Sequence, residues 1–177
     1  MPQSMPAAPL SFDELLDTAQ FQALHLELRD NYAVGEEQSV YDTFLANGTV
    51  PAYDSAFWRP WVSLVERTVA RGVTVRRARI ISEPVTDYVR FEHAITPSNL
   101  RAGEEVRWLG RSQASALALP GNDFWLIDDR LVRFNVFSGD GEVQNPEHSD
   151  VPQVIKLCAD AFQSVWERAS PHDQYEI

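Results

Sequence analysis

The sequence has little cysteine and no long apolar run, and each shortage excludes a class of protein. Its single cysteine, Cys158, excludes an internal disulfide and a cysteine-rich zinc site. Cys158 lies in an apolar helical pattern, which is typical of a buried thiol. No segment approaches the roughly 18 apolar residues that a membrane span needs. The first ten residues have neither a basic flank nor an apolar run, so we expect no secretion signal and a cytoplasmic protein.

Basic residues are also in short supply. The 15 Lys and Arg residues, of which Lys156 is the only lysine, stand against 26 Asp and Glu, so the formal net charge is −11. Attraction to phosphates dominates nucleic-acid affinity, so this charge argues against direct binding of DNA or RNA, even through the arginines at 76, 77 and 79. The acidic surface fits either solubility or a partner with a basic face.

The four histidines are scattered, and none has metal-ligand spacing with another or with Cys158. The segment SGDGE at 138–142 is followed by polar residues rather than a helix, so it does not predict a phosphate-binding loop. No serine has the context of a nucleophile elbow. We therefore expect neither a metal nor a cofactor.

Helix and strand patterns alternate along the chain. After a tail over 1–10 that we expect to be disordered, Ser11 and Glu14 form a capping box that begins a helix. The later patterns predict an extended stretch over 21–30, helices over 36–46 and 57–71, a strand over 73–82, a helix from Pro84 that Pro97 ends, a helical turn closed by Gly103, strands over 104–110, 123–128 and 130–137, and a helix over 151–169.

This order predicts an α/β fold, with a mixed sheet flanked by helices. We expect one domain over 11–170, with 11–56 as a helical extension packed on it. The last residues, 171–177, are expected to be a fraying tail. The tryptophans at 58 and 61 recur at helical spacing and are expected in the core.

Three segments resemble half of a phospholipase-D-like domain: Arg71-Gly72-Val73, Ala102-Gly103 with Val106-Arg107, and the apolar run from Phe124 to Asp128. In that family the third segment carries a nucleophilic histidine and a lysine that stabilises phosphoryl charge. Here the histidine position is Gly121 and the lysine position is Asp123. The resemblance therefore implies a half-domain scaffold without phosphodiester chemistry. The usual pair of histidines would come from two chains, so it also implies a possible homodimer.

A second resemblance covers most of the chain. It is carried by SEPVTDYVRFE at 82–92 and DFWLIDD at 123–129. These segments are similar to an actinobacterial family of unknown function, which has a Ser-Glu-Pro-x-x-Asp-Tyr-x-Arg-Phe-Glu core and an Asp-Phe-Trp-Leu-x-Asp-Asp segment. Genes of that family commonly lie beside helix-turn-helix regulators. The resemblance therefore implies a helix-turn-helix DNA-binding regulator as the partner.

The first of these segments also has a physical interpretation. A helix from Pro84 places Asp87, Tyr88 and Glu92 on one side together with large apolar residues. The preceding strand carries three arginines, although a strand covered on both faces is normally apolar. We expect some of these arginines to pair with Glu83, Asp87 or Glu92. The cluster is then either a buried ion-pair network that fixes helix on strand, or a polar pocket for a ligand or partner.

The candidate binding residues are polar or aromatic positions of these segments: Arg77, Arg79, Glu83, Asp87, Tyr88, Arg90, Glu92, Asp123, Trp125 and Asp128. We expect Asp123 to cap the preceding loop and Asp128 to be a turn residue. No catalytic residue is assigned.

The first hypothesis is a non-catalytic regulatory or interaction protein that binds a helix-turn-helix regulator. The alternative is an enzyme or small-ligand binder that uses Asp87, Tyr88, Arg90 and Glu92. As an acid or base, Tyr88 would need a lowered pKa, which the nearby acids oppose.

Overall fold

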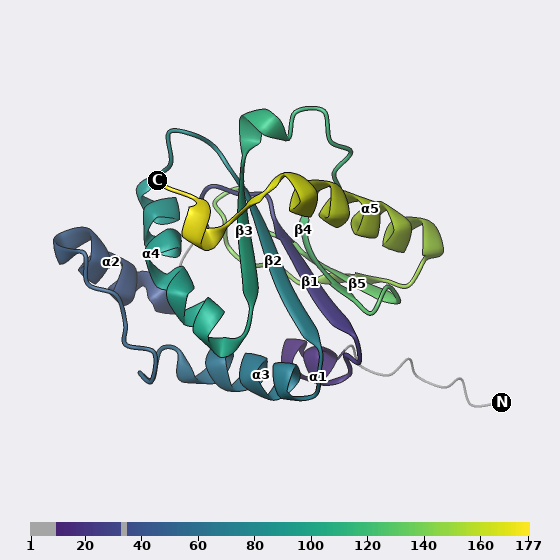
Figure 1. Cartoon of the computed structure of the whole chain (residues 1–177), viewed down its shortest axis with the longest axis horizontal. Helices are drawn as coiled ribbons and strands as arrows, with labels where there is room; N and C mark the ends of the chain where they lie inside the picture. The colour runs from purple at the N-terminus through teal and green to yellow at the C-terminus, as the bar shows by residue number, and fades with distance from the viewer. Residues whose placement is uncertain (1–9, 33–34) are drawn as a thin grey trace.

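A mixed seven-stranded sheet forms the centre of the computed structural model, which describes residues 10–32 and 35–177 (Figure 1). The strand order across the sheet is β6-β5-β4-β1-β2-β3-β7. Strands β1, β2 and β3 are parallel, and the other neighbours are antiparallel. The strands are β1 Gln22–Glu27, β2 Thr74–Ile81, β3 Glu105–Gly110, β4 Asp123–Ile127, β5 Leu131–Asn135, β6 Glu147–Ser149 and β7 Ser170–Pro171.

Helices cover both faces of this sheet, so the predicted α/β fold with a mixed sheet is confirmed. The α-helices are α1 Phe12–Asp17, α2 Gln38–Asn47, α3 Arg59–Ala70, α4 Asp87–Ala102 and α5 Pro152–Arg168, and the short 3-10 turns are η1 Gly35–Glu37, η2 Arg111–Gln113 and η3 His172–Gln174. Helix α5 packs on one face, in front of the sheet in Figure 1. Helices α1, α3 and α4 pack on the other face, and α2 packs on α4. None of the helices in the described ranges is both long and apolar enough to cross a membrane.

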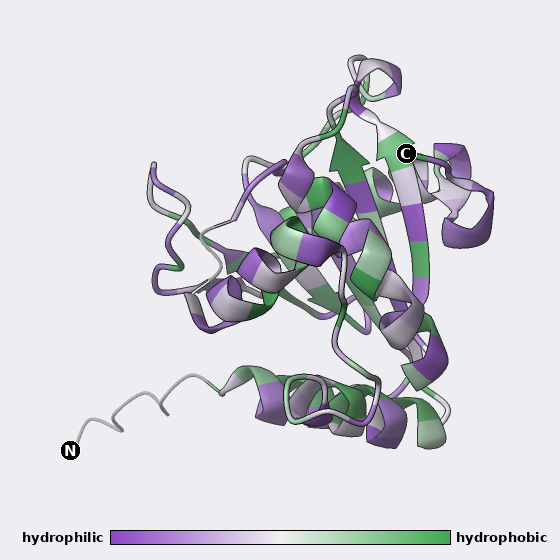
Figure 2. Cartoon of the chain, turned by 90° about the vertical axis from the view of Figure 1, so that its left-hand side faces the viewer, coloured by the Kyte–Doolittle hydropathy of each residue, from purple (hydrophilic) through white to green (hydrophobic). Residues whose placement is uncertain are grey.

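The two faces of the sheet differ in chemistry. Successive side chains of a strand point to opposite faces. In β1, Leu24 and Leu26 belong to the apolar cluster under α5, whereas His25 and Glu27 point the other way. The same alternation holds in β2, β4 and β5, and Figure 2 shows hydrophilic and hydrophobic bands on single strands. Cys158 lies on the buried side of α5, as predicted. The opposite face, under α1, α3 and α4, is called the polar face below.

The expectation of a helical extension over 11–56 is wrong for its middle part. Strand β1 lies between β4 and β2, so this segment supplies a central strand of the sheet. The near-alternation over 21–30 predicts a strand, but the parallel partner, β2, is about 50 residues away in the sequence and leaves no local signal. The domain limits stay a prediction. The tail expected over 1–10 lies outside the described residues, except for Leu10.

Two predicted breaks are also wrong. Pro97 lies inside α4, which continues to Ala102 and ends at Gly103 in the left-handed conformation. The ring of Pro97 is exposed, so the buried side of the helix continues past it through Asn99 and Ala102. The tail over 171–177 does not fray, because β7 pairs with β3 and Tyr175 packs on Trp108.

Asp128 is the predicted turn residue, with φ of 51°, and it also joins two strands. Its carboxylate accepts hydrogen bonds from the backbone N–H groups of Gln20, Phe21 and Gln22 at 2.9, 2.8 and 2.9 Å. These contacts fix the start of β1 against the end of β4. They position the strands that carry the polar face.

Candidate functional site

A cavity of about 820 Å³ lies on the polar face of the sheet. Its floor is made by side chains of β1, β2, β4 and β5. Its walls come from α1, α3, α4, η1, the segment before α3 and Tyr32. In α/β folds, ligands commonly bind beyond the carboxyl ends of the parallel strands. The charged residues Glu27 and Arg79 lie at that end of β1 and β2, and they are paired in register.

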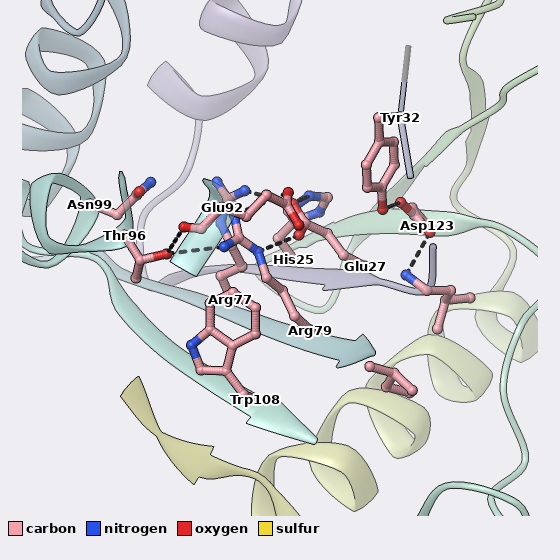
Figure 3. Close-up of polar contacts among 12 residues, drawn as sticks. His25, Glu27, Tyr32, Arg77, Arg79, Glu92, Thr96, Asn99, Trp108 and Asp123 are labelled. Carbon is pink, nitrogen blue, oxygen red and sulfur yellow. Dashed lines mark hydrogen bonds and ion pairs between the residues drawn. The ribbon is translucent and has the colours of Figure 1, made fainter. Parts of the chain in front are cut away.

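Glu27 is the centre of an ion-pair network on this floor (Figure 3). Its two carboxylate oxygens lie 2.6 Å from Nη1 of Arg77 and 2.5 Å from Nε of Arg79. Arg77 also donates from Nε to Glu104, at 2.6 Å. Burial alone would raise the pKa of Glu27, but Arg79 and Arg77 outweigh it and hold this pKa well below its usual range. Glu27 is therefore an anion that two cations clamp.

Glu92 differs from Glu27 in its ionic contacts and in its pKa. Its nearest cation is Arg79, whose Nη2 lies 3.6 Å from Oε1. Within the described ranges, no hydrogen bond reaches the Glu92 carboxylate, and its side chain is 8% exposed. Burial raises the pKa of Glu92 to about 8, against the opposing effect of Arg79. Near neutral pH, Glu92 therefore carries a proton in a large share of the molecules.

His25 and Trp125 form a flat patch beside Glu27. Their rings stack with centroids 4.3 Å apart and an interplanar angle of 5°. The His25 ring nitrogens lie 2.8 Å from the backbone oxygen of Phe124 and 3.1 Å from Oε1 of Glu27. These two contacts fix the orientation of the ring. Eight aromatic residues in all line the cavity: Phe12, Tyr32, Phe57, Trp58, Trp61, Tyr88, Trp125 and Phe137.

Asp123 lies at the end of the floor next to β5. Its carboxylate accepts a hydrogen bond from the backbone N–H of Leu28, at 2.8 Å, and another from the hydroxyl of Tyr32. Burial raises its pKa, which the bond from Tyr32 partly offsets. The expectation that Asp123 caps the preceding loop is wrong, because the carboxylate instead holds the loop that follows β1. The reason is the antiparallel pairing, which brings the start of β4 beside the end of β1.

Six of the ten candidate residues line the cavity: Arg77, Arg79, Tyr88, Glu92, Asp123 and Trp125. Four do not. Glu83 accepts a hydrogen bond from Tyr175, and Asp128 holds the start of β1. Asp87 and Arg90 are exposed on the outer side of α4, because residues one or two positions from Tyr88 point away from it.

The expected pairing of arginines with nearby acids holds only for Arg79 with Glu92. The main partners, Glu27 and Glu104, were not among the candidates, nor were His25 and Tyr32. Glu27 is 50 residues from Arg77 along the chain, so no local spacing indicates the pair. The alternation of His25 and Glu27 with leucines was the available signal, since it marks a polar face in a strand that turned out to be central.

The positions of other groups limit the chemistry of the site. Within residues 10–32 and 35–177, no group of three or more His, Cys, Asp or Glu is arranged to hold a metal ion. Burial raises the pKa of Tyr88 and of Tyr32 well above the usual range, and neighbouring acids, among them Glu92, add to it. Neither phenol is therefore suited to exchange protons near neutral pH.

A family model described as "Domain of unknown function (DUF6879)" matches residues 10–177. The chain belongs to this family. No curated protein is similar to it in sequence. The match agrees with the unknown function that the sequence resemblance implies. The actinobacterial source and the regulator partner stay predictions.

Several solved structures share the fold. NucT from Helicobacter pylori is 12% identical, with a TM-score of 0.50 over 90% of this chain and 87% of that one. Nuc from Salmonella typhimurium, a phospholipase D family member, is 12% identical, with a TM-score of 0.46 over 90% and 86%. The archaeal chromatin protein TrmBL2 is 15% identical, with a TM-score of 0.48 over 89% of this chain, which spans about half (48%) of that one. At these identities the likeness shows the fold alone, which this chain shares with NucT.

Replacing Arg79 with methionine should destabilise the protein by about 3–5 kcal/mol, because Glu27 and Glu92 lose a buried cation. The matched control is Arg76→Met. Arg76 lies on the same strand and pairs with Glu105. The two side chains are 37% and 51% exposed, so loss of this ion pair should cost less than about 1 kcal/mol. Urea unfolding measures both. Equal losses in the two variants would contradict a special role of the buried network.

The raised pKa of Glu92 predicts a pH dependence of stability. Between its usual value of 4.5 and about 8, the folded protein holds a proton that the unfolded chain releases, so stability falls as pH rises through this window. Glu92→Gln should flatten this fall by at least about 2 kcal/mol between pH 5 and 8.5, since each pKa unit is worth about 1.4 kcal/mol. The control Glu105→Gln should keep the wild-type slope. Urea unfolding at several pH values measures it, and an unchanged slope in Glu92→Gln would refute the assignment.

Proposed function

We propose that this domain is a non-catalytic binding protein that holds a small organic molecule in the cavity on its polar face. The observation that carries the proposal is the cavity itself, about 820 Å³ in volume, with an aromatic wall and a floor of internally paired charges. Small-molecule sites are typically of this size, largely apolar, with a few fixed polar groups. The paired floor is rigid before any ligand arrives.

The engagement of the described polar side chains with one another supports a binding role. The positions that the phospholipase-D-like resemblance assigns to histidine and lysine are Gly121 and Asp123. Asp123 is engaged by Leu28 and Tyr32, and Glu27 is engaged by two arginines. A relocated active site that uses Asp87, Tyr88, Arg90 and Glu92 is not favoured, because two of the four point away from the cavity.

Two buried donors support an occupant with acceptor atoms. Nε1 of Trp58 and Nε of Arg133 are buried without a hydrogen-bond partner in the described part of the chain, and both residues line the cavity. The great majority of buried hydrogen-bond donors in proteins are paired, and an unpaired one costs about 1–3 kcal/mol. Oxygen atoms of a bound molecule would satisfy them.

Native mass spectrometry tests the proposal after incubation of the protein with a small-molecule extract of its source cells. We expect a stoichiometric adduct of drug-like size. Ala56→Trp places an indole among the cavity-lining residues at an exposed position, so it should abolish the adduct. Leu157→Trp adds the same group on α5, across the sheet, and should keep it. An adduct that persists in Ala56→Trp, or none in the wild type, would contradict the proposal.

We also propose a helix-turn-helix regulator as protein partner, because the resemblance implies one and the net charge of −11 suits a basic surface. Size-exclusion chromatography of the two proteins together tests this at micromolar concentration and moderate salt. We expect one co-eluting peak, and two separate peaks would refute the partnership. The elution volume of the protein alone also reports on the possible homodimer.

A further inference from the structure

The charges that line the cavity do not balance. Six acidic residues line it against three arginines: Asp13, Glu27, Glu36, Glu37, Glu92 and Asp123 against Arg77, Arg79 and Arg133. Two of these arginines are already paired with Glu27, and Arg77 also pairs with Glu104. Arg133 has no ion pair in the described ranges, but one free arginine does not offset the remaining acids. An anionic ligand would therefore add to an existing excess of negative charge. A cationic ligand would reduce it.

Glu92 is the acid that is placed to meet such a cation. It is more than nine-tenths buried, lines the cavity, and has one ionic contact, at 3.6 Å, in the described ranges. Its surroundings include Arg77 and Arg79 of β2, Glu27 of β1 and Glu37 of η1. Burial raises the pKa of Glu92, so this carboxyl group otherwise holds a proton. A bound cation would take the place of that proton.

The rings beside Glu92 suit a cation as well. Tyr88 precedes Glu92 by one turn of α4, so both point to the same side of the helix. The ring centroids of Tyr88 and Tyr32 lie 5.9 Å apart, and the two ring planes are tilted by 54°. Elsewhere in the cavity, aromatic faces already hold cations of the protein, since Arg77 lies 5.4 Å from the ring centroid of Trp61. Aromatic faces next to a carboxylate are a common way to bind ammonium groups.

From this arrangement we infer that the cavity takes a small organic cation, with its protonated amine against Glu92 and Tyr88 and its flat body against the aromatic wall. The inference rests on the binding role proposed above and adds the chemical class of the ligand. It identifies Glu92 as the residue that selects for charge.

Matched probes that differ only in charge test the inference. Tryptamine is a cation, tryptophol is its neutral analogue and indole-3-propionate is the anionic one; tyramine, tyrosol and 4-hydroxyphenylpropionate form a second set with a smaller ring. Isothermal titration at pH 8.5 should show that the amine of at least one set binds at least tenfold more tightly than its neutral and anionic analogues. Equal or tighter binding of the neutral or anionic analogues would overturn the inference. This experiment uses the wild-type protein alone.

Variants then test the role of Glu92. Glu92→Gln should weaken binding of the amine at least tenfold and leave the neutral analogue within about twofold. Asp160→Asn removes the same charge from an exposed position of α5, across the sheet, and should change neither. An amine affinity that survives Glu92→Gln in a folded protein would show that Glu92 is not the counter-ion.

The outcomes separate this inference from the binding role itself. If extract incubation yields an adduct that lacks a basic nitrogen, the binding role stands and the cation inference fails. If the adduct is an amine, both stand, unless a neutral or anionic probe binds as tightly as its matched amine. If neither the extract nor any probe binds, the binding role fails and the inference fails with it.

Discussion

The clamp of Glu27 between Arg77 and Arg79 is the interaction on which the rest of the polar face depends. It places three charges on the middle of a sheet that helices cover on both sides. The covering helices contact this floor through polar or aromatic side chains, such as Thr96 of α4, because each charge must keep its partners. Their apolar side chains meet the sheet at its apolar ends, through Leu16 of α1 and Val89 of α4. The cavity is therefore a consequence of the ion pairs as much as of the fold.

These ion pairs also decide what the floor does not bind. Free arginines in a cavity are typical of phosphate recognition. Here burial would lower the pKa of Arg79, but Glu27 and Glu92 outweigh it and raise this pKa, and Glu104 does the same for Arg77. A phosphate would have to compete with acids that are already in place. The site thus has the positive charge of Arg77 and Arg79 satisfied from within, with Asp123 at the position where the resemblance expects lysine.

The sequence predicted secondary structure better than the tertiary contacts between its elements. Alternation and helical spacing indicated strands β1 to β5 and most helices, but not the short edge strands β6 and β7, and the arginines of β2 with Glu92 indicated a polar cluster. The partners of those arginines could not be predicted, because Glu27 and Glu104 reach them through parallel pairing over 50 and 27 residues. Pro97 misled for a different reason, since packing of Asn99 and Ala102 outweighs the local preference of proline. Local pattern therefore marks which residues are unusual, and sheet topology decides which of them meet.

The motif over 82–92 places side chains on two opposite sides of α4. Tyr88 and Glu92 point inward to the cavity, whereas Asp87 and Arg90 are exposed on the outside of α4. The helix is tied to the sheet through Glu92 and Arg79, whose Nη1 also donates to Thr96 at 3.0 Å. A cation bound at Glu92, as proposed above, would change the charge balance of that tie and so act on the helix that presents Asp87 and Arg90 to solvent. The proposed ligand site and a partner that used Asp87 and Arg90 would therefore not be rival uses of the motif, because the same helix would connect them.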